Sequence, residues 1–133
     1  MLDFLWCFAN MEKYIRQKME SYYIACVENK TNGAIIDKAS NKIIGLAGLN
    51  PFKENEPEIE WKLGVMSWNK GYATEIGKEI ISEAFKTTNI IGIYGMADPE
   101  NVASRRVLQK IGMKYLGINE FRDKKDAFYY IGR

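Results

Sequence analysis

Apolar residues near the start of the chain recur at helical spacing. Ile15, Met19, Tyr22 and Cys26 are separated by four, three and four residues, which places them on one face of an amphipathic helix. We therefore expect a helix from Asn10 to the stretch NKTNG, whose asparagine and glycine favour the left-handed backbone that ends helices.

The pattern then changes to that of strands. Residues 33–50, GAIIDKASNKIIGLAGLN, predict two short strands about a DKASN turn, because β-branched isoleucines favour extended backbone. Residues 51–57, PFKENEP, are polar and bounded by prolines, so we expect a loop there. In residues 58–65, EIEWKLGV, charged and apolar side chains alternate, which is typical of a half-buried strand.

The second half of the chain alternates between the two patterns. Residues 71–85, GYATEIGKEIISEAF, have apolar positions at helical spacing. Residues 89–97, NIIGIYGMA, form the nearly continuous apolar run of a strand that is covered on both faces. A second helix is expected in residues 98–112, and residues 113–132 predict two strands about a charged turn.

The second of these helices has recognisable start and stop signals. Asp98 and Pro99 suit its first turn, Asn101 would cap it one turn later, and Gly112 suits its C-terminal end. Because no internal repeat or low-complexity linker interrupts the order of elements, we expect one mixed α/β domain over residues 1–133, with a central mixed sheet flanked by helices.

Composition and charge narrow the classes of function. The chain is 47% hydrophobic and 27% charged with a formal net charge of +2, which argues against disorder and against a dedicated nucleic-acid binder. It has no histidine, and its two cysteines, Cys7 and Cys26, lack CxxC spacing, so we expect no metal site, no disulfide framework and a reduced, cytoplasmic setting. The opening MLDFLWCF lacks a basic start and a cleavage site and is too short to span a membrane.

The stretch WNKGYATE, residues 68–75, lies where a predicted strand gives way to a predicted helix. The first N–H groups of a helix have no partners within it, and they attract anions. Gly71 lets a ligand approach the backbone. The small side chain of Ala73 leaves space beside the next helical turn, and Lys70 adds positive charge. The stretch is therefore either a phosphate-binding loop or a tight turn that binds no ligand.

Two separated stretches resemble a known family. EIEWKLGVMSWNKGYATEIGKEIISEAF and, after one further strand, NVASRRVLQKIGMKYLG resemble the GNAT superfamily of acetyl-CoA-dependent N-acetyltransferases. The resemblance is greatest to its Rim-type branch, the ribosomal-protein N-terminal acetyltransferases. Trp68 stands at the first position of the superfamily's Gln/Arg-x-x-Gly-x-Gly/Ala motif, where that branch often has an aromatic residue. The GNAT fold is thus implied, with acetyl-CoA as co-substrate and no metal.

The resemblance also implies where the coenzyme binds. Backbone amides at the start of the first predicted GNAT helix would hold its pyrophosphate, the end of the preceding strand would pair with the pantetheine arm, and the later helix would line the arm's other side. The residues that this assigns to cofactor binding are Leu63, Gly64, Val65, Asn69, Lys70, Gly71, Tyr72, Ala73, Thr74, Asn101, Ser104 and Arg106. A basic helix stretch can equally be a solvated face, which leaves that alternative open for Arg106.

Acetyl transfer to an amine requires a base, because a free amine is protonated at neutral pH. Glu58 and Glu60 are the candidates, and Glu58 is preferred because it matches the glutamate of the Rim-type strand. We expect direct attack of the amine in a ternary complex. Leu108 stands where many members have a tyrosine acid, so Ser104 or water would protonate the leaving thiolate.

The sequence leaves the acceptor and the assembly open. The acceptor would be a small-molecule amine or a protein N-terminus. The chain has no room for the strand and helix that open Rim-type enzymes, so we expect a shortened start, and a homodimer through MLDFLWCF or an open sheet edge. A coenzyme A-binding module without turnover and an interaction protein that assembles through its sheet edge are the alternatives.

Overall fold

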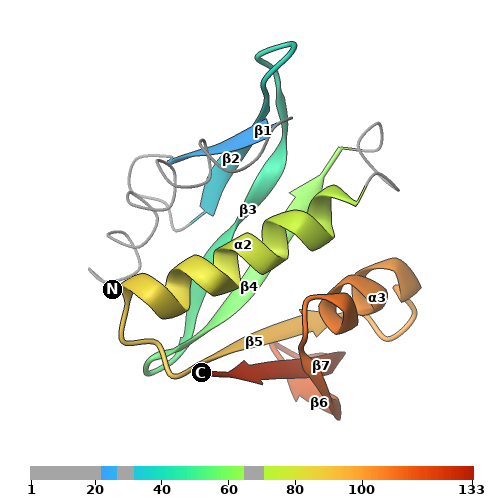
Figure 1. Ribbon diagram of the computed structural model, residues 1–133. Coiled ribbons are helices and arrows are strands. Elements are labelled where there is room, and N and C mark those ends of the chain that lie inside the picture. Colours follow the sequence, from blue (N-terminus) through green and yellow to red (C-terminus); the bar gives the residue numbers. More distant parts are fainter. Residues whose placement is uncertain (1–21, 27–31, 65–70) are drawn as a thin grey trace.

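A seven-stranded mixed sheet with two helices makes up the computed structural model, which describes residues 22–26, 32–64 and 71–133 (Figure 1). The strand order is β1-β2-β3-β4-β5-β7-β6. The elements in chain order are β1 (Tyr22–Cys26), β2 (Asn32–Asp37), β3 (Ile43–Lys53), β4 (Glu56–Leu63), α2 (Tyr72–Thr87), β5 (Gly92–Ala97), α3 (Val102–Lys110), β6 (Lys114–Phe121) and β7 (Lys124–Gly132). The mixed α/β fold predicted from the sequence is confirmed.

The sheet opens between β4 and β5. These two strands run parallel, and their pairs are Glu58↔Tyr94 and Ile59↔Gly95. β4 continues to Leu63 and β5 to Ala97, and the two strands spread apart towards these ends (Figure 1). The helices α2 and α3 follow directly after the spread ends of β4 and β5 along the chain. The fold therefore creates a gap in the sheet beside two helix starts.

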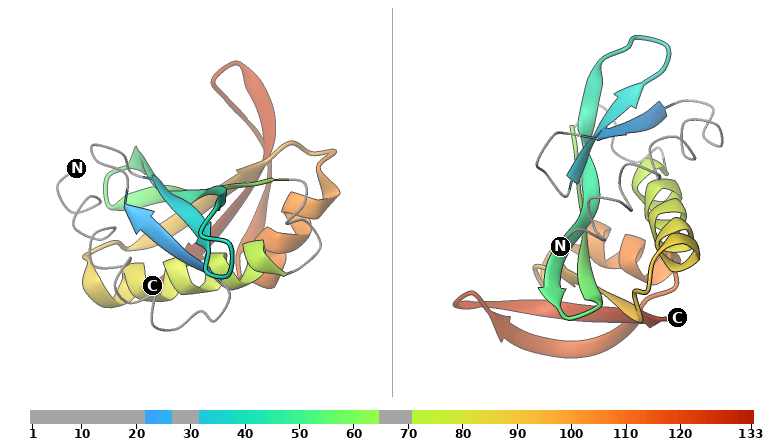
Figure 2. Two further views of the ribbon diagram at one scale, coloured as in Figure 1. Left: turned by 90° about the horizontal axis from the view of Figure 1, so that it is seen from above. Right: turned by 90° about the vertical axis from the view of Figure 1, so that its left-hand side faces the viewer.

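The core lies between the sheet and the helices, which cover the same face (Figure 2). On α2, Ile76, Ile80 and Ala84 are at most 1% exposed and recur at intervals of four, so one stripe of the helix packs on the sheet. On β5, Gly95 allows close packing of α3, because a Cβ there would lie 2.4 Å from the Leu108 side chain.

The helix predicted to run from Asn10 towards residue 30 is wrong over Tyr22–Cys26. These five residues form β1, which pairs antiparallel with β2. Residues 22, 24 and 26 also fit a period of two, and pairing with β2 decides between the two periods. Residues 1–21 lie outside the described residues, and so does the rest of the predicted helix. The shortened start therefore stays a prediction.

The loop predicted for residues 51–57 is also wrong. β3 extends to Lys53 and β4 begins at Glu56, so a tight turn with Asn55 at φ 57° joins them. Pro51 is tolerated because the register shifts between Asn50 and Lys53, where ladder bonds are interrupted. Phe52 packs edge-to-face on two other aromatic rings 5.0 Å away, which holds the strand end against the sheet.

The remaining predicted elements are confirmed. The β2–β3 and β6–β7 hairpins form, as do β4, α2, β5 and α3. α3 begins at its Asn101 cap, which was the later of the two predicted starts, and Gly112 at φ 96° follows its end. No helix in the described part of the chain is long and apolar enough to cross a membrane.

Candidate functional site

The first part of the site is the backbone of β4 beside the gap. The N–H of Gly64 donates to the carbonyl of Ile44 at 2.8 Å, so this residue faces β3. In an antiparallel ladder the backbone groups alternate in direction, which turns those of Trp61 and Leu63 towards the β5 side. Because the β4–β5 pairs end at Ile59↔Gly95, these groups reach the gap. Of the predicted residues, Leu63 lies at this position, and the amide of Gly64 faces β3.

The second part is the start of α2. Gly71 is its N-cap residue with left-handed backbone at φ 76°, and among the described residues no side chain caps this helix end. A Cβ built on Gly71 meets no atom of the described residues within 4 Å. Tyr72, Ala73 and Thr74 form the first turn and are half-buried. This corner can present backbone N–H groups to an anion.

Three of the predicted cofactor-binding residues, Val65, Asn69 and Lys70, lie outside the described residues. Trp68, at the first motif position, lies there too. Their assignments stay predictions.

The start of α3 contains the predicted Asn101 and Ser104. Asn101 Oδ1 accepts from the backbone N–H of Ser104 at 3.1 Å, so this asparagine caps the helix. The half-buried Ser104 lies one turn into α3. Arg105 donates to the Tyr129 hydroxyl and to the Pro99 carbonyl, both at 3.0 Å, and therefore ties α3 to β7. Arg106 next to it is exposed.

Glu58 lies on β4 at the point where the gap begins. Ile59 faces the core, so the alternation of the strand turns Glu58 to the face of the sheet opposite the helices. Burial raises the pKa of the Glu58 carboxyl, the negative charges of Glu60 and Asp126 raise it further, and the positive charge of Arg122 opposes them. A raised pKa brings this carboxylate closer to the range in which a general base works at neutral pH.

Glu60 is engaged elsewhere. Its carboxylate accepts a hydrogen bond from the Asn50 side chain and pairs with Lys62 at 3.8 Å. These contacts favour Glu58 over Glu60 as the available base.

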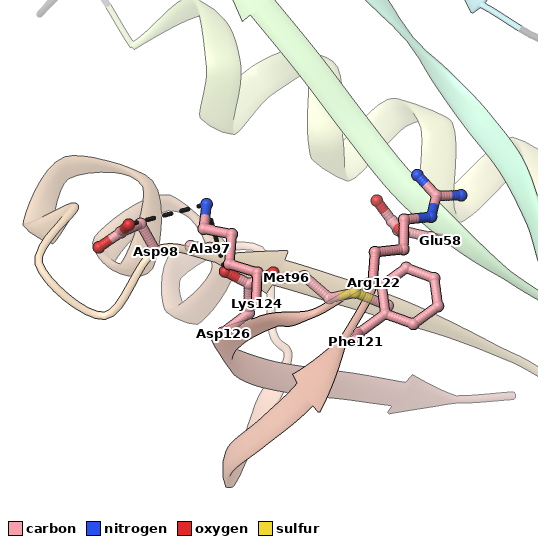
Figure 3. A pocket seen from close by; sticks show the side chains of 8 residues that line it. All are labelled: Glu58, Met96, Ala97, Asp98, Phe121, Arg122, Lys124 and Asp126. Atoms are coloured by element: carbon pink, nitrogen blue, oxygen red, sulfur yellow. Dashed lines mark ion pairs between the residues drawn. The ribbon is translucent and has the colours of Figure 1, made fainter.

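A cavity of about 230 Å³ opens beside Glu58 on the same face (Figure 3). It combines residues from β4, from the end of β5 and from the β6–β7 hairpin. Its lining residues are Glu58, Met96, Ala97, Asp98, Phe121, Arg122, Lys124 and Asp126. In the described part of the chain, no group of His, Cys, Asp or Glu side chains is arranged to hold a metal ion.

The sequence predicts Glu58 as the base but gives no sign of the charged residues that lie around it. In the sequence, Asp98 indicates only a possible helix start, and Arg122, Lys124 and Asp126 fall in or beside a charged turn. Nothing in the spacing of residues 122–126 shows that this turn folds towards β4, because the β5–β7 pairing brings it there.

Comparison with known proteins decides the family. A family model described as an acetyltransferase (GNAT) domain matches residues 6–114. The chain belongs to the GNAT acetyltransferase family. The match agrees with the order of elements in this GNAT domain, from the β2–β3 hairpin through the β4–β5 gap to α3.

Curated and solved relatives agree with this assignment. The GNAT chain is 37% identical over 84 residues to the uncharacterized N-acetyltransferase YnaD of Bacillus subtilis (strain 168), covering 59% of this chain and 49% of YnaD. The chain therefore spans about half the length of that relative. The crystal structure of a GNAT-family acetyltransferase from Bacillus anthracis superposes with a TM-score of 0.68 at 27% identity, covering 76% of this chain and 65% of that one.

A further solved structure bears on the Rim-type prediction. The ribosomal-protein-S5-alanine acetyltransferase of Vibrio fischeri superposes on this GNAT chain with a TM-score of 0.70 at 19% identity, covering 76% of this chain and 60% of that one. This likeness shows a shared fold. The Rim-type branch itself stays a prediction.

Proposed function

We propose that this chain transfers the acetyl group of acetyl-CoA to a primary amine, either a small molecule or a peptide N-terminus. The observation that carries the proposal is the position of Glu58, a carboxylate of raised pKa that faces an open cavity where β4 and β5 separate. The family match supports it, because its members are acetyltransferases by description.

The described residues fit a bound coenzyme. The start of α2 suits a pyrophosphate, because its first backbone N–H groups follow the left-handed Gly71 and no side chain of the described residues caps them. The end of β4, from Trp61 to Leu63, and the Gly64 that follows it suit an extended, amide-rich arm that lies along this strand beside the gap. When bound, acetyl-CoA supplies an activated acyl group. Asn69, Lys70 and Val65 on one side, and Asn101, Ser104 and Arg106 on the other, complete the proposed coenzyme site.

The residues of the chain then act on the acceptor. Glu58 accepts the proton of the acceptor's ammonium group, directly or through a water, which leaves a neutral amine able to attack. Holding both reactants side by side supplies much of the rate without a covalent enzyme intermediate. A backbone N–H at the end of β4 meets the developing negative charge. Ser104 or water delivers a proton to the departing thiolate.

Other assignments follow from the same proposal. Residues 1–133 act as a single domain, belong to the Rim-type branch and work in the cytoplasm. The edge strand β6 exposes Tyr115, Leu116 and Ile118, each close to half of its surface, and supports a homodimer through the open sheet edge.

Titration of purified protein with acetyl-CoA, followed by release of free thiol with a panel of primary amines, tests the function. We expect saturable binding and amine-dependent thiol release. Binding without release from any amine would leave a coenzyme-binding module. Absence of both would remove the proposal.

One substitution tests the location of the coenzyme. Gly71→Asp places a carboxylate against the phosphates, and we expect it to weaken coenzyme A binding at least about tenfold, or about 1.4 kcal/mol. Calorimetry measures this. Gly117→Asp on β6 is the matched control, because Gly117 also has positive φ, at 105°, and also has nothing within 4 Å of a built Cβ. Equal affinity in both variants would show that the phosphates bind elsewhere.

A further inference from the structure

The face of β4 opposite the helices carries two neighbouring carboxylates. Glu58 and Glu60 are two residues apart on one strand, so both side chains point to this face. On β3, Asn50 lies opposite Glu58 and Gly48 lies opposite Glu60. The proposed chemistry uses Glu58 and leaves the role of Glu60 open.

Asn50 determines where the Glu60 carboxylate lies. Gly48, directly opposite Glu60, has no side chain, and the hydrogen bond to Glu60 Oε2 comes instead from Nδ2 of Asn50 at the diagonal position. Asn50 is at the same time the cross-strand neighbour of Glu58. The hydrogen bond therefore draws the Glu60 carboxylate towards Glu58.

Lys62 offsets the charge of Glu60 only in part. Its ammonium lies 3.8 Å from Glu60 Oε1, but the Lys62 side chain is 76% exposed, whereas that of Glu60 is 32% exposed. Solvent weakens an ion pair with so exposed a partner, so the negative charge of Glu60 still acts on its neighbour. Burial is the largest cause of the raised pKa of the Glu58 carboxyl, and the charge of Glu60 is the next largest.

We propose that Asn50 and Glu60 are positioning residues for acetyl transfer: Asn50 holds the Glu60 carboxylate beside Glu58, and this second negative charge makes Glu58 a stronger base towards the acceptor's ammonium group. The inference rests on the proposed function and adds to it two residues that act through Glu58. A carboxylate beside a like charge takes up a proton more readily, because protonation relieves the repulsion. A stronger base removes the acceptor's proton faster.

Other ionisable groups also surround Glu58 on this face, and the variants below leave all of them in place. They come from β3, from β5 and its end, and from the β6–β7 hairpin, and they are Lys53, Tyr94, Asp98, Arg122, Lys124 and Asp126. A change in the pKa of Glu58 in these variants therefore reports on Asn50 and Glu60.

The pKa of Glu58, measured without acetyl-CoA, tests the Asn50–Glu60 pair independently of acetyl transfer. Carbon NMR titration of glutamate-labelled protein follows the Glu58 carboxyl, whose signal is assigned by its loss in Glu58→Gln. In Glu60→Gln, which keeps the shape and removes the charge, the pKa of Glu58 is expected to fall, because the neighbouring negative charge is gone. In Asn50→Ala the pKa of Glu58 is expected to fall by less, because the Glu60 charge moves away but remains.

Two further variants show whether Asn50 acts through Glu60. In the double variant, Asn50→Ala is expected to add no further fall to that of Glu60→Gln. Glu54→Gln removes the same charge at an exposed position of the β3–β4 turn, and it is expected to leave the pKa of Glu58 unchanged. Circular dichroism of each variant establishes that it folds.

The pH dependence of acetyl transfer gives a second readout. The lower pKa keeps Glu58 ionised to lower pH, so the acid limb of the kcat/KM profile of Glu60→Gln is expected to move to lower pH. The plateau is expected to fall severalfold, because Glu58 is then a weaker base. A plateau that falls while the acid limb stays at the same pH would make Glu60 a structural residue only.

The outcomes separate the two proposals. If Glu60→Gln leaves the pKa of Glu58 unchanged, or if Asn50→Ala lowers it equally with and without Glu60, the positioning role is overturned even where amines are acetylated. If the pKa of Glu58 changes as expected but no amine releases thiol from acetyl-CoA, the effect of the Asn50–Glu60 pair on Glu58 stands and the proposed function fails.

Discussion

At the scale of single residues, the environment of Glu58 decides what it can do. The sequence offers two glutamates on the same strand face, and they differ only once their neighbours are known. Glu60 is held by Asn50 and Lys62, whereas Glu58 is partly buried at the cavity. Desolvation raises the pKa of Glu58, so its base form is lost at a higher pH than for an exposed glutamate.

Glu58→Gln is expected to lower acetylation about 10²-fold or more at neutral pH, the usual contribution of a general base. The loss is expected to shrink at alkaline pH, where more of the acceptor amine is already neutral. Thiol release measured across pH checks this. A variant whose loss is the same at every pH would exclude Glu58 as the base.

Arg122→Gln is expected to move the acid limb of the kcat/KM profile to higher pH. The Arg122 charge lowers the pKa of Glu58, so its removal raises that pKa further, and the base form is then lost at a higher pH as the pH falls. Lys125→Gln, which removes a charge from the same hairpin but outside the cavity lining, is the control. An acid limb that stays at the same pH or moves to lower pH would contradict the electrostatic effect of Arg122 on Glu58.

At the scale of elements, the separation of β4 from β5 creates the site. β3 pairs with the other side of β4 along six successive residue pairs from Gly45↔Leu63 to Asn50↔Glu58, so β4 stays paired with β3 to its end while β5 leaves it after two pairs. The close approach of β3 to the end of β4 depends on Gly45. A Cβ built there would lie 2.1 Å from the backbone oxygen of Lys62.

Gly45→Ala is expected to destabilise the fold by about 1 to 3 kcal/mol, because backbone must move to admit the methyl group. Urea unfolding measures this. Since the shift falls on the end of β4, coenzyme A affinity is expected to fall as well. Gly132→Ala is the control, because its Cβ would make an ordinary 3.6 Å contact with the Tyr130 ring. Equal stability of the two variants would contradict the close approach.

At the scale of the whole molecule, long-range contacts join elements that are distant in the chain. The Arg133 side chain donates to the carbonyls of Phe85, Thr88 and Ile90, which ties the end of β7 to the end of α2 and the link into β5. Tyr130 donates to Glu56 at 2.6 Å, and this bond raises the pKa of Tyr130 to about 12. Both contacts join residues that are more than 40 positions apart in the chain.

Arg133→Ala is expected to lower the free energy of unfolding by about 1.5 kcal/mol, the lower end of the range for hydrogen bonds to a charged group, because the side chain is partly exposed. Chemical denaturation monitored by tryptophan fluorescence checks this. Lys114→Ala, at an exposed position on β6, is expected to change stability by less than about 0.5 kcal/mol. An Arg133 variant as stable as that control would show that the contacts contribute nothing.

The sequence by itself determined the local elements from β2 onward, the glycine at the start of α2, the candidate base and the resemblance to a family. These features depend on hydrophobic periodicity, helix caps and turn residues, which act between residues that are close together in the chain. It failed at Tyr22–Cys26, where pairing with β2 overrides an apparent helical period, and at residues 51–57, where aromatic packing extends a strand through a proline. Only the tertiary structure decided that Glu58 differs from Glu60 and that Asp98, Lys124 and Asp126 meet beside it. Desolvation and ion pairing depend on residues that are distant in the chain, so no local pattern contains them.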